Sequence, residues 1–386
     1  MTEALACSLV AAIALTYAGY PLAVIAMSAF GQKRPWHYES NQETEQLSIN
    51  ILISAYNEET HLAAKLESVL DATEIYGPGV RVLVADDGSS DATLAVAQEF
   101  EARGVEVISL PRGGKAAALN YMAGIADGDI LVFTDADPLF RLDTLVKLVE
   151  PFADSSVGAV AGNVVMTTKS GTLAFAGQLY RRYESALRKA EDRLFGAVSA
   201  DGGLYAIRRN LMPHVPPDGT DDFHISTAAP AARMRIAFAP FACVTETAMS
   251  SGKKDLQRRI RITVRGLTAL KRRAELMNPN KHGSYALGLF MHKLARRLAP
   301  LLIVPLSVVA TILAASGSLL WSLMIAAILA TAAIATVGMF SDQKLPRILR
   351  MPYTLALHLI GLGAGVLLFA AGRRFSTWTA QRTVAS

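Results

Sequence analysis

Residues 128–137 read GDILVFTDAD, which joins a short apolar run to two carboxylates. The run Ile130–Phe133 predicts a buried strand, and Asp135 and Asp137 follow its carboxyl end, separated by one residue. Because alternate side chains of an extended segment point the same way, both can face a common point beyond the sheet edge. Ligands bind at that edge in open α/β sheets, and two hard oxygen donors suit Mg²⁺ or Mn²⁺ on a substrate diphosphate. A solvated acidic turn is the alternative, so the flanking sequence must decide.

The segments around this stretch alternate between apolar strands and helices. Strands are predicted at 47–54, 80–85 and 105–109, and helices at 58–72, at 92–103 and after the Gly-Gly turn at residue 113. This alternation is typical of an α/β fold with a parallel sheet and helical crossovers. Every polar cluster falls at the carboxyl end of a strand. The arrangement therefore favours a nucleotide site at that edge.

Two of the polar clusters have a chemical and a structural interpretation. Residues 86–91, DDGSSD, form a turn that can present Asp87 to a base or ribose, or can simply cap the next helix. Residues 113–115, GGK, open a helix, where free N–H groups and Lys115 favour phosphate. A helix start with an unrelated lysine is the alternative to the second interpretation.

The composition points to a membrane protein. The chain has 386 residues, of which 52% are hydrophobic, and its mean hydropathy is +0.30, too apolar for an ordinary soluble enzyme. Leu5–Phe30 is a nearly uncharged run of spanning length, followed by the basic stretch GQKRPWH with Lys33, Arg34 and Trp36. A signal peptide is the alternative, but we favour a retained anchor at 1–31. The positive-inside rule then places residue 31 onward in the cytoplasm.

The carboxyl-terminal third contains three further apolar runs. Leu298–Phe340 holds no charged residue and is long enough for two spans that turn near Gly317, and Tyr353–Ala371 forms a third. By parity the tail would lie outside, yet it carries Arg373, Arg374 and Arg382, which conflicts with the positive-inside rule. The net charge of +5 is explained by a membrane-facing surface and not by nucleic acid. Cys7 and Cys243 have no partner at metal-ligand or redox spacing and are predicted to be free.

Four motifs in order resemble the nucleotide-sugar-binding half of family-2 glycosyltransferases, which have the GT-A fold. They are AYNEE at 55–59, VADDGSSDAT at 84–93, GGKAAALN at 113–120 and FTDAD at 133–137. The resemblance continues through ADGGLYAIRRN at 200–210, TDDFHIS at 220–226 and QRRIRITVRGL at 257–267. The one-plus-three arrangement of spans is similar to that of membrane-bound polysaccharide and chitin-oligosaccharide synthases.

The resemblance implies roles for residues of the donor site. Asp87 would contact the uracil or ribose of a UDP-sugar, with Tyr56 and Glu58 as walls of the nucleoside site. Asp137, and less directly Asp135, would hold the divalent metal on the diphosphate. Lys115 would lie near the nucleotide.

The resemblance also implies a catalytic base, Asp222, in the acidic pair Asp221–Asp222. A sugar hydroxyl is a poor nucleophile near neutral pH, so a carboxylate within hydrogen-bond reach must take its proton as C1 is attacked. A single in-line displacement inverts the anomeric centre. Capping of the following helix is the alternative for this pair.

One motif departs from the family pattern. Processive synthases carry Gln-x-x-Arg-Trp, but here Gln257 is followed by RRIRI, and no Trp is present in either register. Arg259 or Arg261 could still contact the diphosphate, whereas an aromatic platform for a sugar is missing. Long processive synthesis is therefore in doubt.

An amphipathic helix is predicted at 281–297, directly before the spans. Its apolar face holds Leu287, Phe290, Met291, Leu294 and Leu298, and the opposite face holds His292, Lys293, Arg296 and Arg297. This pattern suits a helix in the cytoplasmic headgroup layer. An ordinary helix packed on the catalytic domain is the alternative.

The sequence thus predicts an α/β GT-A domain at 45–280 between the anchor and the interface helix, three transmembrane helices at 298–372 and a tail at 373–386. We expect a multi-pass inner-membrane enzyme that transfers a sugar from a nucleotide-diphosphate donor to a saccharide or polyprenyl-linked acceptor in cell-surface polysaccharide synthesis, with its catalytic domain in the cytoplasm. A processive synthase with a translocation channel is one alternative. An inactive membrane scaffold that binds nucleotide-sugar or a partner synthase is another, although it would not need a metal pair and a base together.

Overall fold

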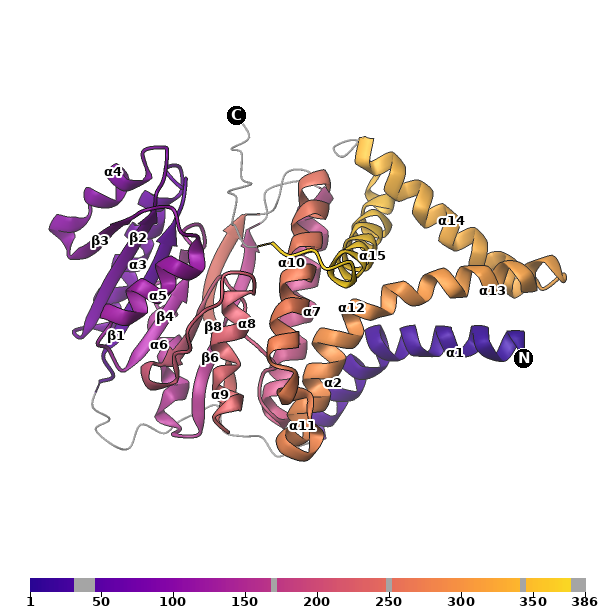
Figure 1. The fold of residues 1–386 in the computed structure, drawn as a ribbon, viewed down its shortest axis with the longest axis horizontal. Helices are drawn as coiled ribbons and strands as arrows, with labels where there is room; N and C mark the ends of the chain where they lie inside the picture. Colours follow the sequence, from indigo (N-terminus) through magenta and orange to yellow (C-terminus); the bar gives the residue numbers. More distant parts are fainter. Residues whose placement is uncertain (31–45, 168–171, 248–251, 341–344, 376–386) are drawn as a thin grey trace.

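A computed structural model describes residues 1–30, 46–167, 172–247, 252–340 and 345–375. Lys33, Arg34, Trp36 and Arg382, on which part of the predicted topology rests, lie outside these residues. Figure 1 shows a sheet domain at one end and a group of long helices at the other. Among the described residues the sheet has eight strands, in the order β3-β2-β1-β4-β7-β6-β8-β5.

The first half of the sheet is parallel, as the alternation of strands and helices predicts. It contains β1 (Ile49–Ala55), β2 (Val80–Asp87), β3 (Val105–Leu110) and β4 (Ile130–Thr134). Strands β1 and β4 are buried on both faces, which explains their nearly continuous apolar sequences. The pairing Ile53↔Thr134 and Ala55↔Asp86 aligns the carboxyl ends of β1, β2 and β4 at one edge.

The second half of the sheet is mixed, which the sequence pattern did not predict. It contains β5 (Leu139–Phe140), β6 (Val157–Thr167), β7 (Tyr205–Arg208) and β8 (Arg235–Thr247). Strand β7 runs antiparallel to β4 and β6, whereas β6 and β8 are parallel.

Helices cover both faces of the sheet. One face packs on α3 (Leu62–Tyr76), α4 (Thr93–Gln98) and α6 (Thr144–Val149), and the other on α5 (Lys115–Ile125), α8 (Asp221–Ser226) and α9 (Ala228–Ala231). Leu62, Leu66 and Val69 recur at helical spacing and are fully buried in the first layer. These two layers are the core that holds the loops at the carboxyl edge.

Beyond β8, long helices connect the sheet domain to the apolar end of the molecule. They are α7 (Thr172–Leu194), α10 (Gly252–Arg272), α11 (Pro279–Leu289) and α12 (Arg296–Leu298), with a π-helical turn at Phe290–Ala295 between the last two. The amphipathic segment 281–297 turns its basic face toward the protein: His292 is buried, whereas Leu287 and Phe290 are exposed. The sequence predicted that this basic face contacts lipid headgroups. His292 and Arg296 instead pair with carboxylates of α7, which corrects that prediction for these two residues.

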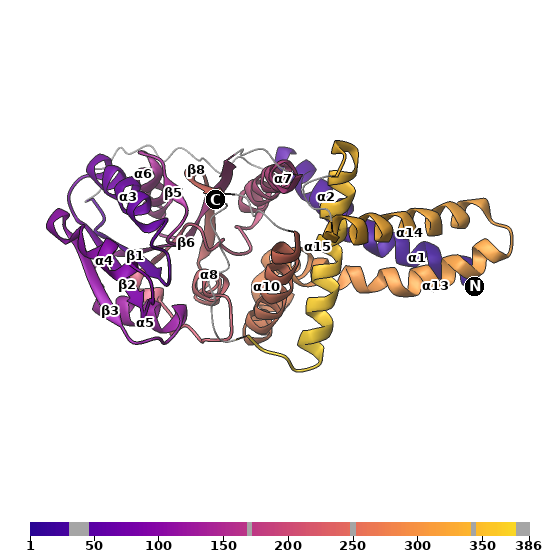
Figure 2. The ribbon, with the colours of Figure 1, turned by 90° about the horizontal axis from the view of Figure 1, so that it is seen from above.

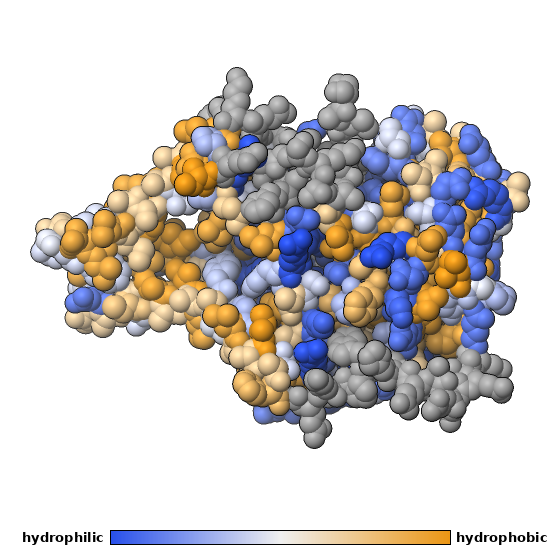
Figure 3. Space-filling model, turned by 180° about the vertical axis from the view of Figure 1, so that it is seen from behind, coloured by the Kyte–Doolittle hydropathy of each residue, from blue (hydrophilic) through white to orange (hydrophobic). Residues whose placement is uncertain are grey.

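Within the described ranges, four helical segments are long and apolar enough to cross a membrane: Thr2–Phe30, Pro279–Ala315, Leu319–Met339 and Ile348–Ala370. They contain α1 (Thr2–Ala14), α2 (Tyr20–Phe30), α13 (Ile303–Ala315), α14 (Leu319–Phe340) and α15 (Arg347–Ala370). The turn between α13 and α14 has Gly317 at φ +90°, where the sequence predicts it. Apolar residues dominate this projecting end, and hydrophilic residues gather at the opposite end (Figure 3).

Helix α15 differs from the other apolar helices in its direction. Figures 1 and 2 show α1, α13 and α14 extending away from the sheet domain, whereas α15 runs across that direction beside α10. The two helices approach closely because α15 carries glycines at the contact: a Cβ on Gly365 would lie 2.5 Å from Cβ of Thr263. His358 bonds the guanidinium of Arg259 across this contact at 2.6 Å.

Candidate active site

The loops after β1 and β2 are tied together at the carboxyl edge of the sheet. Asn57 adopts a left-handed conformation with φ +54°, which asparagine tolerates better than most residues. Its side-chain oxygen accepts a hydrogen bond from the N–H of Ser90 at 2.9 Å, and its own N–H donates to Oγ of Ser89 at 3.0 Å. Glu58 follows, nearly buried, with its N–H donating to Thr93 and its carboxylate against His61 at 3.0 Å.

Asp87 holds the Gly-Gly turn that precedes α5. Its carboxylate is 2% exposed and accepts hydrogen bonds from the N–H groups of Gly113 and Gly114, both at 2.8 Å. It also pairs with Arg112, whose guanidinium lies 3.4 Å from the centre of the Tyr56 ring. The structure thus brings Tyr56 and Asp87 together around Arg112, a residue that the sequence interpretation missed although it directly precedes the Gly-Gly-Lys motif.

Lys115 joins the two acidic motifs. Its ammonium lies 2.7 Å from Oδ1 of Asp135 and 2.8 Å from Oδ2 of Asp221. Burial alone would lower its pKa, but the charges of Asp135 and Asp221 raise the pKa of Lys115 above its ordinary value. The lysine is therefore a permanent cation between the DxD loop and the acidic pair.

The two aspartates of the DxD loop lie at the carboxyl edge of the sheet. Asp135 and Asp137 are half-buried, whereas Ala136 between them is buried, as alternation predicts. Among the described residues there is no group of three or more His, Cys, Asp or Glu side chains placed to hold a metal ion. Two carboxylates fit Mg²⁺ or Mn²⁺ only where a ligand diphosphate and water supply the remaining oxygens.

A buried lysine supports this loop from below. Lys65 is 0% exposed, and its ammonium donates to Oγ1 of Thr134 at 2.7 Å and to the carbonyl of Pro138 at 2.5 Å. These residues flank Asp135–Asp137, so one side chain holds both ends of the DxD loop. Burial lowers the pKa of Lys65. Its position on the apolar face of α3 was the signal that the sequence offered.

The two aspartates of the acidic pair have different environments. Asp221 is buried, accepts a hydrogen bond from the hydroxyl of Tyr205 at 3.2 Å and faces Lys115. Burial would raise its pKa, but Lys115 lowers it below the ordinary value. Asp222 is half-buried, and burial together with the charges of Asp221 and Asp201 raises its pKa to about 6. The pair therefore combines a fixed carboxylate with one poised to exchange a proton near neutral pH.

The capping alternative does not describe this pair. Both aspartates lie in the first turn of α8, whose N-cap is Thr220, and the Thr220 side chain makes no capping bond.

Comparisons with known proteins agree with this geometry. The family model for glycosyl transferase family 2 matches residues 50–212, which hold the donor-site loops and the DxD motif. An N-acetylglucosaminyltransferase from Rhizobium leguminosarum bv. trifolii is 31% identical over 133 residues, covering 33% of this chain and 73% of that protein. The chain belongs to glycosyltransferase family 2.

Other relatives share shorter parts of their length with this glycosyltransferase. A beta-monoglucosyldiacylglycerol synthase from Trichormus variabilis is 33% identical over 132 residues, which is 28% of that protein. The solved structure of a mannosyltransferase from Pyrobaculum calidifontis, in complex with GDP-Man and Mn²⁺, has a TM-score of 0.71 at 24% identity. That likeness covers 97% of this chain and 100% of the other. The GT-A fold with flanking helices is thus confirmed.

The two arginines predicted to contact the diphosphate lie in different surroundings on α10. Arg259 faces α15, because it pairs with Asp255 at 2.7 Å and bonds His358. Arg261 is half-buried, and the charges that act on it come from Arg258 and Arg265. Two residues along a helix are about 200° apart, so Arg259 and Arg261 cannot share a face. The structure thus places Arg259 at the contact with α15 and on a different face of α10 from Arg261.

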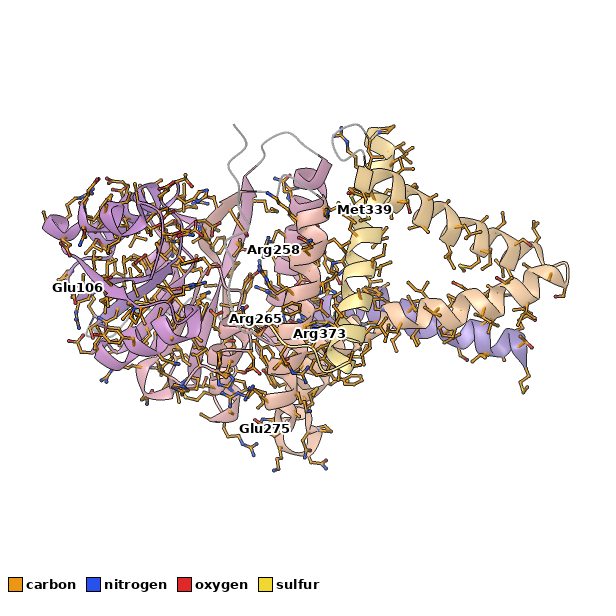
Figure 4. The ribbon with its side chains drawn as sticks, turned by 45° about the horizontal axis from the view of Figure 1, so that its top comes forward. Glu106, Arg258, Arg265, Glu275, Met339 and Arg373 are labelled. Atoms are coloured by element: carbon orange, nitrogen blue, oxygen red, sulfur yellow. The ribbon has the colours of Figure 1, made fainter. Side chains whose placement is uncertain are left out.

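Arg265, which the sequence interpretation left without a role, lies on the site-facing side of α10. Its Nε donates to the carbonyl of Gly219 at 3.0 Å, and its charge helps lower the pKa of Asp221. Figure 4 shows Arg258 and Arg265 pointing from α10 toward the sheet. Arg258, Arg261 and Arg265 recur at helical spacing on α10, and Arg265 is the one whose charge reaches the acidic pair.

Proposed function

We propose that this protein is a membrane-bound, metal-dependent, inverting glycosyltransferase that moves a sugar from a UDP-sugar to a saccharide or lipid-linked acceptor. The observation that supports the proposal is the bridge from Asp135 through Lys115 to Asp221, which joins the DxD motif to the acidic pair that contains Asp222. The raised pKa of Asp222 supports its role as that base.

In the proposed reaction, proton transfer takes place on one side of this bridge and departure of the diphosphate on the other. The acceptor hydroxyl oxygen forms a bond to C1 of the sugar while the bond from C1 to the β-phosphate oxygen breaks. The electron pair of the broken bond leaves with UDP. Asp222 takes the hydroxyl proton. Asp135 and Asp137 would hold Mg²⁺ or Mn²⁺, which neutralises charge on the departing diphosphate.

The cations around the diphosphate have separate tasks. Lys115 offers a fixed positive charge next to Asp135, and Arg261 is the arginine of α10 that we retain for the donor. Tyr56, Glu58 and Asp87 form the nucleoside side. Arg112 lies at stacking distance on Tyr56, so a base that stacks there has to displace or rest on its guanidinium.

The membrane segments support a place at the cytoplasmic face of an inner membrane. Four candidate spans flank the sheet domain, and a chain that begins outside would bring the domain to the cytoplasm after its first span. Products of this enzyme would enter cell-surface polysaccharide or glycolipid, the classes that the names of its relatives describe.

The test is release of nucleoside diphosphate by purified, detergent-solubilised protein with Mn²⁺ or Mg²⁺. The panel holds UDP-N-acetylglucosamine, UDP-glucose and GDP-mannose, beside the variants Asp137→Ala and Asp222→Asn. Sugar-selective turnover that both variants lose supports the proposal. Full acceptor-dependent turnover in Asp222→Asn would remove the base assignment, and nucleotide binding without turnover in any mixture would favour the scaffold alternative.

A further inference from the structure

The segment from η6 (Phe290–Ala295) to α12 carries four basic residues, and only two of them are neutralised. His292 lies between Glu191 at 2.8 Å and Glu184 at 3.2 Å, and Arg296 pairs with Glu184. Lys293 and Arg297, which we call the basic pair, make no ion pair with any residue that the structure describes. Both are only partly exposed.

The guanidinium of Arg297 packs between its own segment and α10. Its Nη1 donates to the backbone carbonyl of Lys293 at 2.5 Å. A Cβ on Gly266 of α10 would lie 2.7 Å from Nη2, so the guanidinium lies directly against the α10 backbone at this glycine. Arg297 is therefore held between two helices.

The basic pair is close enough to the proposed base for their charges to interact. The carboxylates whose charges reach both Lys293 and Arg297 are Glu184 and Asp222. Glu184 is already shared by His292 and Arg296, so Asp222 is the remaining carboxylate of these two whose charge can act on the basic pair. Helix α13 follows α12 after one turn at Ala299–Leu302, so a molecule in the bilayer can reach this place.

We infer that Lys293 and Arg297 bind the phosphate or diphosphate group of a lipid acceptor. The inference rests on the proposed function, because it assigns the acceptor side of the same site. Partly buried cations without a counter-ion are costly, and an anionic ligand removes that cost. Lysine and arginine together are common phosphate ligands.

The in-line geometry of the reaction agrees with this placement. The donor diphosphate belongs beside Lys115 and the DxD motif, and the attacking hydroxyl must approach C1 from the opposite side. An acceptor anchored at the basic pair presents its hydroxyl to Asp222 from the membrane side. The acceptor class is therefore a lipid whose phosphate or diphosphate neighbours the accepting sugar or alcohol.

Binding of farnesyl diphosphate to the full-length protein tests the inference. The titration is done in detergent with saturating UDP and Mg²⁺, so that the donor site is occupied, and inorganic pyrophosphate is titrated in parallel. We expect wild type to bind farnesyl diphosphate more tightly than pyrophosphate. The double variant Lys293→Met/Arg297→Met should bind it at least about tenfold more weakly, with UDP affinity unchanged.

Two control variants test whether the loss of binding comes from the basic pair itself. Lys253→Met/Lys281→Met removes the same charge from exposed positions and should bind farnesyl diphosphate like wild type. Lys293→Arg keeps the charge and should retain most affinity. An equal loss in the exposed control, a loss of UDP affinity instead, equal loss in Lys293→Arg, or no binding by wild type would overturn the inference.

The source of the phosphate and the proposed function are judged separately. Pyrophosphate that binds as tightly as farnesyl diphosphate would show a site for free diphosphate and overturn the lipid assignment. Farnesyl diphosphate binding that depends on the basic pair, in a preparation without sugar-nucleotide turnover, would support the phosphate site while the glycosyltransferase proposal fails.

Discussion

The pH dependence of turnover gives the sharpest test of the site, because the two aspartates of the acidic pair should titrate far apart. Asp222 must be ionised to accept a proton, and its pKa is raised to about 6 by burial and by the charges of Asp221 and Asp201. As pH falls through that value, Asp222 becomes protonated and turnover should fall. kcat/KM should be half-maximal near pH 6 and about tenfold lower at pH 5 than at its plateau. A carboxylate with an ordinary pKa near 4 would lose only about a tenth at pH 5.

The assay is initial-rate UDP release at subsaturating donor between pH 4.5 and 8, with protein integrity checked at each pH. Asp201→Asn removes one of the charges that raise the pKa of Asp222, so its midpoint should move to lower pH. Asp218→Asn is the matched control, since Asp218 pairs with Arg272 at 2.6 Å and is not among the main charges that shift the pKa of Asp222; its midpoint should stay. A flat profile down to pH 5, or a midpoint that ignores Asp201→Asn, would refute the reasoning.

Four further predictions concern supporting residues. Lys65→Met frees both ends of the DxD loop, so it should raise the Mn²⁺ concentration needed for half-maximal activity several-fold, with a smaller change in kcat. An unchanged Mn²⁺ titration would contradict this. Gly266→Ala should displace a guanidinium 2.7 Å away and raise the acceptor KM without changing UDP affinity, as paired titrations would show. Arg261→Met should raise the donor KM, and Arg259→Met should instead lower the thermal midpoint; the reverse pattern would restore Arg259 to the site. Arg373→Cys, in a variant without the native cysteines, should react with an impermeant thiol reagent only from the side of the sheet domain.

The edge of the sheet was predictable because its signals are local. A run such as Ile130–Phe133 is apolar on both faces only where a strand is buried, and the polar residues after it must then lie at the carboxyl edge. The identity of Asp222 as the poised member of its pair was implied by family resemblance. The physical reason for its raised pKa includes the nearby charges of Asp221 and Asp201, and only the structure shows that these residues are close to Asp222.

What the sequence could not predict depends on contacts between distant segments. His292 looked like part of a solvated basic face because its partners Glu184 and Glu191 are about a hundred residues away in the chain. Lys65 lies on the apolar face of α3, but that position alone does not distinguish a loop support from a surface lysine with a buried stem. The separation of Arg259 from Arg261 is different, because helical periodicity alone already forbids a shared face.

The direction of α15 addresses the conflict over the charged tail. Hydropathy treats α13, α14 and α15 alike, yet α15 runs across the direction of α1, α13 and α14 in both views, close against α10. A bilayer that those three helices cross would have α15 along its surface, where its exposed Ile348, Leu355 and Leu367 can enter the lipid. Three crossings instead of four would put Arg373 and Arg374 on the side of the sheet domain, which is where the positive-inside rule expects them.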